Sequence, residues 1–470
     1  MAVPVEASAM GLELQRISGQ PGSPYYRYEI FVTAGGKDLH PLQIIRQDNH
    51  RDYKGSFMDD HSVSMKYGAG TVIFDIAPYV EDLTMTIKKY RLGGFHGEEP
   101  GAVNVRTYTA YLTDDIPKGP EISSAAQFAD RETANRNKTL DLTFVLEEVA
   151  MTQLRKMSVG TIPRGNPPYM VLKTFIRNAL DSMQLDVNSK ISGFQMEEAS
   201  NKAPRDHIIL PDGTQLIDLP DLLQNEQGGI YSTGLGFYLQ GQTAYAWGLY
   251  DLSRANTAQR VLQIFLAPSG STTGIDRTWT DDGRSISVWA AGAPKLLNDA
   301  MDILNTEGNA VRFADSSKLV GGMGTVKDNK YTMSRSTNNS EYATTTVGNG
   351  SMYARTTAGR FSANPYVETS KMARRQGQFM LVPWEHSNPD LLIPTMVVEV
   401  YYDAGGEIKT MSGVLTGNTS QDILQGKGMT DRAFACKTMI EVFLDRSDPD
   451  FIEYLKKGGS ISGTPQINPL

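Results

Sequence analysis

Runs of alternating apolar and polar residues recur along this chain, and they restrict its fold more than any other feature. In "DLTMTIKKYRL", Leu83, Met85 and Ile87 alternate with polar residues, as they do along one face of a β-strand. The run "YYRYEIFVTAGGKDLH" reaches the pair Gly35 and Gly36, which is typical of a hairpin turn. Comparable runs return from about residue 205 and again near the C-terminal end. The sequence therefore predicts a mainly β, multidomain protein with a few helices, in the α+β class.

Two longer segments have helical spacing instead. In the predicted helix 167–183, Leu172 and Ile176 lie on one face, Asn166 stands at the N-cap position, and two prolines suit the first turn. The second predicted helix covers 293–307, "APKLLNDAMDILNTE".

Changes in composition divide the chain into regions. A length of 470 residues is enough for three or four domains at roughly 100–200 residues each. One stretch is rich in Ser, Thr, Asn and Gly, as a long loop or an exposed β-arm is. The predicted regions are a β domain at 1–115, an α/β connecting region at 116–204, a β-rich domain at 205–330, the polar loop or β-arm at 331–365, a C-terminal β domain at 366–446, and a short helix with a tail at 447–470.

Charge and cysteine content exclude several classes of protein. The net charge of −8 argues against a nucleic-acid coat, which would carry a basic excess. We expect no membrane contact, because there is no apolar run of about 18 residues and no visible signal peptide, and we expect synthesis in a cytoplasm. The single cysteine, Cys436, forms neither an internal disulfide nor a cysteine-based zinc site. Its apolar neighbours predict a core position in a strand.

The stretch "GGIYSTGLGFYLQGQTAYAWGLYD" has the glycines of a nucleotide loop and the aromatic residues of a binding platform. A dinucleotide loop is excluded because Leu239 stands where a third glycine is needed and no helix follows. The prediction is a β-hairpin of strands 237–240 and 244–250, with Tyr245 and Trp247 on one buried face. The alternative is an exposed aromatic face that docks on a neighbouring chain.

No complete motif for catalysis or for cofactor binding is found in the sequence. "QDILQGKGMT" lacks the first glycine and the final hydroxyl residue of a phosphate loop, and His50-Arg51-Asp52 matches a kinase tripeptide without the other kinase motifs. Asp59–Ser62 and His96–Glu99 are interpreted as solvated turns or loops, and the six histidines lack metal-ligand spacing. We therefore predict no enzyme activity, no catalytic residue, no cofactor and no metal. A carboxylate pair remains open, because any two of 53 acidic residues can meet in space.

The order of segments resembles one known family. The stretch "LDLTFVLEEVAMTQLRKMSVGTIPRGNPPYMVLKTFIRNAL" is followed by "AYAWGLYD", then by "GQFMLVPWEHSNPDLLIP" and "LIPTMVVEVYYDAGGEIKTMSGVL". Over residues 25–445, this organisation is similar to that of the baseplate hub proteins of contractile-tailed phages and related machines. The resemblance lies in the order of the segments and in short local sequence patterns, and it includes no diagnostic motif.

The resemblance implies a structural virion protein. Hub proteins of this family are homotrimers, and each chain carries two tail-tube-like β-barrel domains, the first here at 1–115. Three chains make a ring of six barrels that joins a sixfold tail tube, or its initiator, to a threefold spike. Wedge proteins of the baseplate are further candidate partners, while membranes and specific nucleic-acid sites are not. The repeated Ala-Gly-Gly at 34–36 and 404–406 is then a trace of the two barrels.

Other functions remain as alternatives. One is another tail component, a tube initiator or a wedge protein, which only contacts or symmetry would separate from a hub. The others are a β-rich cell-wall hydrolase and a glycan-binding protein that uses the aromatic hairpin.

Overall fold

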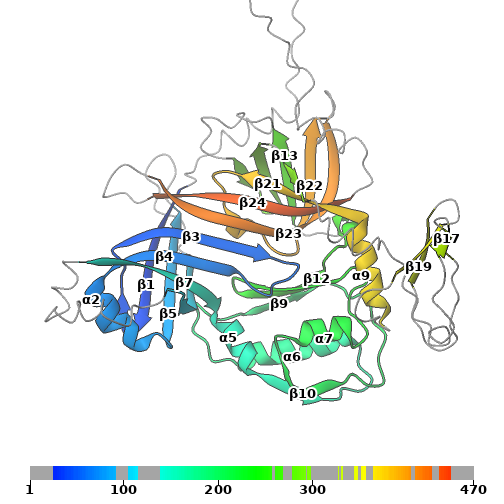
Figure 1. The fold of residues 1–470 in the computed structure, drawn as a ribbon, viewed down its shortest axis with the longest axis horizontal. Helices are drawn as coiled ribbons and strands as arrows, with labels where there is room; N and C mark the ends of the chain where they lie inside the picture. Colours follow the sequence, from blue (N-terminus) through cyan, green and yellow to red (C-terminus); the bar gives the residue numbers. More distant parts are fainter. Residues whose placement is uncertain are drawn as a thin grey trace, which may run out of the picture. The chain divides into compact units, whose positions relative to one another are not determined.

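The structure is a computed structural model, and it is drawn as a ribbon in Figure 1. The residues it describes are 25–91, 104–114, 138–256, 260–267, 278–292, 294–297, 326–327, 330–331, 343–347, 351–355, 364–403, 408–425 and 433–445. The chain forms two compact units, Met1–Leu296 with Tyr366–Leu470, and Leu297–Pro365. In the second unit the described strands form two hairpins, β17 (Val326–Lys327) with β18 (Lys330–Tyr331) and β19 (Ala343–Val347) with β20 (Ser351–Arg355).

Eight antiparallel strands of the first unit close a β-barrel, here called barrel 1. Hydrogen-bonded neighbours follow the order β23–β3–β4–β7–β6–β5–β1–β24, and β24 pairs with β23 again. Closure leaves no free strand edge in this circuit. The strands are β1 (Tyr25–Ala34), β3 (Gln43–Asp52), β4 (Asp60–Gly68), β5 (Leu83–Arg91), β6 (Asn104–Leu112), β7 (Thr139–Glu148), β23 (Ile408–Gln425) and β24 (Ala433–Asp445).

A second set of eight strands, here called barrel 2, uses β23 and β24 as well. Its order is β14–β15–β13–β22–β23–β24–β21–β16. The sheet curls until β14 comes close to the end of β21: the Thr278 hydroxyl donates to the Glu385 carbonyl at 2.6 Å, and the Trp279 indole donates to the His386 carbonyl at 3.1 Å. The added strands are β13 (Val261–Ala267), β14 (Trp279–Asp281), β15 (Ser285–Ala291), β16 (Lys295–Leu296), β21 (Gly377–Trp384) and β22 (Val397–Asp403).

The two shared strands are long enough to serve both barrels, with 18 residues in β23 and 13 in β24. The register between them shifts at Leu415 and Gly417, where the chain passes from barrel 2 to barrel 1. A β-bulge bends a strand in this way. Only glycine fits at Gly417, because a Cβ there would lie 2.6 Å from the carbonyl oxygen of Arg51. A single local irregularity therefore lets one strand enter two barrels.

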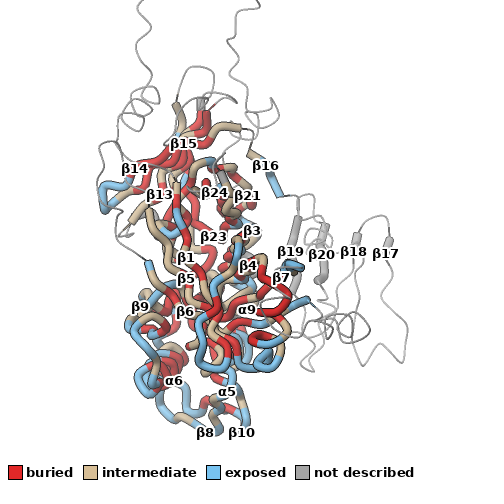
Figure 2. Tube along the Cα trace, turned by 90° about the vertical axis from the view of Figure 1, so that its left-hand side faces the viewer, coloured by how far each residue is buried: buried red, intermediate tan, exposed pale blue. Residues whose placement is uncertain are grey.

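A helical layer covers the sheet β11–β12–β9 (Figure 1). Apolar residues of the helices pack on Phe237, Leu239, Ala244 and Ala246 of this sheet. The two-stranded sheet of β8 and β10 carries many exposed residues, while the strands shared by the barrels are largely buried (Figure 2). The elements are α5 (Val149–Lys156), α6 (Pro168–Ser182), α7 (Leu219–Asn225), β8 (Ser158–Thr161), β9 (Gly193–Met196), β10 (Leu210–Gln215), β11 (Leu235–Gln240) and β12 (Thr243–Gly248).

Short elements connect these layers. Strand β2 (Lys37–Leu39) pairs with β1 across the predicted turn, where Gly35 and Gly36 have φ of 55° and 76°. The remaining elements are α2 (Ala69–Thr71), η1 (Val72–Ile76), η2 (Ala77–Tyr79), η3 (Leu252–Asn256), η4 (Pro389–Leu391) and α9 (Pro365–Gln376). No helix in the described ranges is long and apolar enough to span a membrane.

The mainly β, multidomain class is confirmed, and so is the helix predicted over 167–183, as α6. Its N-cap is Pro167 rather than Asn166, whose amide donates to the Arg164 carbonyl instead. The start of the helix predicted over 293–307 is wrong, because Lys295–Leu296 form β16 and pair with β21. This pairing across the chain overrides local helix propensity.

The predicted domain boundaries differ in part from those of the structure. Barrel 1 draws β7, β23 and β24 from beyond residue 115, because closing the circuit needs partners that are distant in sequence. The region predicted as a C-terminal β domain begins with helix α9. Within the polar region 331–365, strands β19 and β20 form a hairpin. Residues 298–307, 404–407 and 447–470 and the loop at 96–99 lie outside the described residues.

Candidate functional site

The interior of barrel 1 is apolar over most of its length and polar at one end. Tyr28, Gln47, Arg51, Lys89 and Arg106 are among the residues that line a cavity of about 70 Å³ there. They lie at inward-facing positions of four strands, β1, β3, β5 and β6, and both Gln47 and Arg51 belong to β3. Such a concentration of buried charge is unusual in a β-barrel core and has to be matched by partners.

An ion-pair network satisfies much of this charge. The Arg51 guanidinium lies 2.9 Å from Asp59 and 3.5 Å from Asp390, and it also donates to the Pro389 carbonyl at 2.8 Å. Lys89 lies 2.6 Å from Asp390. Pro389 and Asp390 belong to η4, between two strands of barrel 2, so the network ties that connection to barrel 1.

Asp59 is the acceptor at the centre of the network. Its Oδ2 accepts from Arg51 and, at 2.8 Å, from the Asn49 amide, and its Oδ1 accepts from the Tyr238 hydroxyl at 3.0 Å. Tyr238 lies on β11, so one carboxylate joins barrel 1 to the hairpin. This arrangement corrects the interpretation of Asp59–Ser62 as a solvated turn. Asp60 begins β4, and the His61 side chain that follows is only 8 % exposed.

Burial and the neighbouring charges shift the pKa values of the groups around this cavity. Burial alone would raise the pKa of Asp390, but Lys89 and Arg51 outweigh it and lower the pKa to about 2. Burial raises the pKa of Glu148 to about 7, although Arg106 lies 2.5 Å away and opposes the shift. Burial lowers the pKa of His61 to about 4, so its imidazole, which contacts the Gln47 amide oxygen at 3.2 Å, is neutral at pH 7.

The buried imidazole leads to a pH-dependent prediction. The pKa of His61 falls from 6.5 to about 4 on folding, so its stabilising effect is complete above pH 6.5 and is lost as the pH falls toward 4. The loss amounts to up to about 3 kcal/mol. We expect the free energy of unfolding of the wild type to fall relative to that of His61→Gln between pH 6.5 and 4.5 in urea titrations. Parallel pH profiles of the two proteins would contradict this.

The aromatic hairpin is present as predicted, with strands β11 and β12 joined at Gly241, whose φ is 61°. The prediction of one buried face is too narrow, because both faces are buried. Tyr245 and Trp247 pack into the core of barrel 2, while Ala244 and Ala246 pack under the helices. Trp247 has no exposed surface, which rules out the alternative of an exposed aromatic platform.

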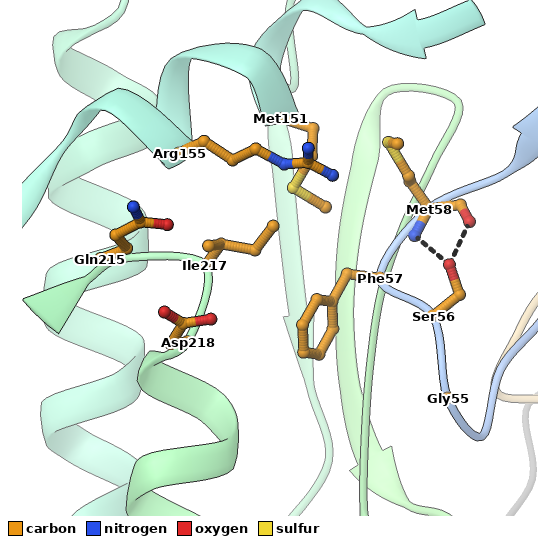
Figure 3. A pocket seen from close by; sticks show the side chains of 9 residues that line it. All are labelled: Gly55, Ser56, Phe57, Met58, Met151, Arg155, Gln215, Ile217 and Asp218. Carbon is orange, nitrogen blue, oxygen red and sulfur yellow. Dashed lines mark hydrogen bonds between the residues drawn. The ribbon is translucent and has the colours of Figure 1, made fainter. Parts of the chain in front are cut away.

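A groove of about 430 Å³ opens between barrel 1 and the helical layer, and we call it the α5 groove (Figure 3). Three segments form it: the connection from β3 to β4, helix α5, and the chain that leads from β10 into α7. Its lining residues are Gly55, Ser56, Phe57, Met58, Met151, Arg155, Gln215, Ile217 and Asp218.

The walls of the α5 groove are held by backbone and side-chain contacts. The amide of Leu239 donates to the Phe57 carbonyl at 2.7 Å, and the ring of Phe57 packs edge-on against that of Phe237 at 5.9 Å. The Ser56 hydroxyl donates to the Met58 carbonyl at 2.8 Å (Figure 3). This β3–β4 connection is thereby fixed along the open edge of β11.

The other residues considered above for catalysis or metal binding do not form such a site within the described ranges. Cys436 is confirmed as a buried core residue of β24, and burial raises the pKa of its thiol well above the usual range. Within the described ranges, no group of three or more His, Cys, Asp or Glu side chains is arranged to hold a metal ion. The polar barrel end and the α5 groove were both missed from sequence, because their residues come from segments that are far apart in the chain.

Comparison with known proteins gives likenesses of structure only. No protein-family model matches the chain, and no curated protein matches it in sequence. A tail protein from Neisseria meningitidis MC58 is similar at 13% identity and a TM-score of 0.42, over 88% of this chain and 96% of that one. The 43 kDa tail protein of prophage MuSo2 from Shewanella oneidensis is similar at 9% identity and a TM-score of 0.41, over 88% of this chain and 98% of that one. An E. coli component of the type VI secretion system is similar at 10% identity and a TM-score of 0.40, over 89% of this chain and 77% of that one. That protein is itself described as structurally similar to the T4 tail proteins gp27 and gp5.

Proposed function

We propose that this protein is a structural component of a contractile tail, the trimeric hub that joins a sixfold tube to a threefold spike. The observation that carries the proposal is that one chain builds two β-barrels on a single pair of shared strands, β23 and β24. Because both barrels use the same backbone, each protomer supplies them as a fixed pair. Three protomers in a closed ring then present six barrels, which converts threefold into sixfold symmetry.

The proposed partners follow from this symmetry. The six-barrel face binds the tail tube or its initiator, the threefold face binds the spike, and wedge proteins contact the outside of the ring in the baseplate of the virion. The role is structural rather than catalytic. A net charge of −8 is consistent with a channel that DNA passes without adhering.

Solution mass tests the proposal. Light scattering on a sizing column should give about 155 kDa, three times the 51.7 kDa of the chain. Electron-microscopy averages of that species should show six barrels around one axis. A dimer, or a monomer at every concentration, would contradict the closed ring and favour a wedge protein. A trimer without six equivalent barrels would remove the adapter role.

A further inference from the structure

The α5 groove combines a buried apolar base with a polar rim. Met151 and Ile217 at its base are buried, whereas Arg155, Gln215 and Asp218 at its rim are exposed. A volume of about 430 Å³ lies within the range of pockets that take small ligands or anchoring side chains, roughly 300–1,000 Å³. Its composition is therefore the best guide to what it binds.

The charge that remains unpaired at the groove is negative. Arg155 is matched by Glu147, whose Oε1 lies 3.0 Å from the guanidinium. The carboxylate of Asp218, by contrast, makes no side-chain cap with α7 and has no hydrogen-bond or ion-pair partner among the described residues. Burial raises the pKa of nearby Asp221, and the charge of Asp218 adds to the shift. A cation at the rim would relieve this local excess of negative charge.

The apolar walls suit a flexible aliphatic stem. Met58 and Met151 offer polarizable thioethers that adapt to unbranched chains, and the ring of Phe57 offers a face for a cation. Figure 3 shows Phe57 and Met151 turned toward the space beside Ile217 and Asp218, while the Met58 side chain extends upward along the opposite wall of the groove. A side chain with a methylene stem and a positive end group satisfies both parts of the groove.

We propose that the α5 groove binds a basic side chain, lysine or arginine, presented by a segment of a partner protein. The stem packs between Met58, Met151 and Phe57, and the cation pairs with Asp218. The inference rests on the groove alone, so it stands or falls independently of the trimeric hub. An acidic side chain that pairs with Arg155 is the rival occupant, and it is an outcome of the test.

The test uses the full-length protein labelled with ¹³C-methyl methionine, because two of the lining residues are methionines. The probe is acetyl-glycyl-lysyl-glycinamide, with the norleucyl and glutamyl analogues in parallel. Signals are assigned with Met58→Leu and Met151→Leu. We expect saturable shifts of both methyl signals with the lysyl peptide and little change with the analogues. In Asp218→Asn, the lysyl peptide should bind about fivefold more weakly, as loss of an exposed ion pair implies.

The matched control is Asp212→Asn, which removes an exposed carboxylate on β10 that does not line the groove. Binding of the lysyl peptide should be unchanged in this variant. Equal shifts with the norleucyl peptide would overturn the role of charge, and shifts only with the glutamyl peptide would assign the groove to an acidic partner. The absence of any shift at Met58 and Met151 would end the proposal.

Discussion

Replacing Trp247 by alanine is expected to lower the free energy of unfolding of the barrel 2 core by about 3–5 kcal/mol. The indole is fully buried on β12, and it packs edge-on against the ring of Tyr53 at 6.2 Å. Opposite it on β11 stands Gly236, where an added Cβ would lie 2.4 Å from the indole. The site is thus shaped around the indole, so truncation is expected to leave a cavity.

Trp247→Phe is the matched variant. The indole N–H has no hydrogen-bond partner among the described residues, so phenylalanine loses packing volume without orphaning another group. We expect a clearly smaller loss than in Trp247→Ala, because phenylalanine keeps an aromatic ring in the core and leaves a smaller cavity. For both variants, the free energy of unfolding is measured in a denaturant titration that is monitored by circular dichroism, on the transition that reports this core. A loss under about 1 kcal/mol in Trp247→Ala would show that the core relaxes around the site.

The sequence predicts the local structure of this region well. The hairpin, its glycine turn and the buried position of Trp247 follow from alternation and turn chemistry over a short stretch. Helix α6 follows from apolar spacing and the two prolines in the same way. In each case the residues that decide the structure are close together in the chain.

The closing contacts could not be predicted, because they join distant segments. The hydroxyl of Tyr28 donates to Asp422 at 2.9 Å, and that of Tyr26 donates to the Ser387 carbonyl at 3.2 Å. Each partner lies more than 350 residues away along the chain. The sharing of β23 between two barrels likewise depends on the bulge at Gly417, which has no signature in a single sequence.

The polar end of barrel 1 was missed for a different reason. Charged residues in a strand normally mark a solvated face, so Arg51 and Lys89 suggest that their strands leave the core. In the structure both side chains continue the inward-facing side of the barrel, exposed by only 7% and 14%. Only the three-dimensional pairing with Asp59 and Asp390 makes this burial tolerable.

Asp59 provides the sharpest test of that network. Asp59→Ala is expected to destabilise the protein by about 3–5 kcal/mol, because it leaves the buried charge of Arg51 without its nearest carboxylate. It also leaves the Asn49 amide and the Tyr238 hydroxyl without their acceptor. Asp60→Ala, which removes the adjacent and exposed carboxylate, should change the unfolding free energy by less than about 0.5 kcal/mol.

Asp59→Asn separates charge from shape. The amide keeps one acceptor oxygen and the volume of the side chain but loses the negative charge that faces Arg51, so its cost measures the electrostatic part of the network. In a cycle with Arg51→Met, the double variant should be less destabilised than the sum of the two single variants, because removing both partners leaves no unpaired charge. Additive losses would mean that Asp390 alone holds Arg51. In that case Asp59 would serve the Tyr238 contact, and the network would join barrel 1 to the hairpin through that hydrogen bond rather than through the ion pair with Arg51.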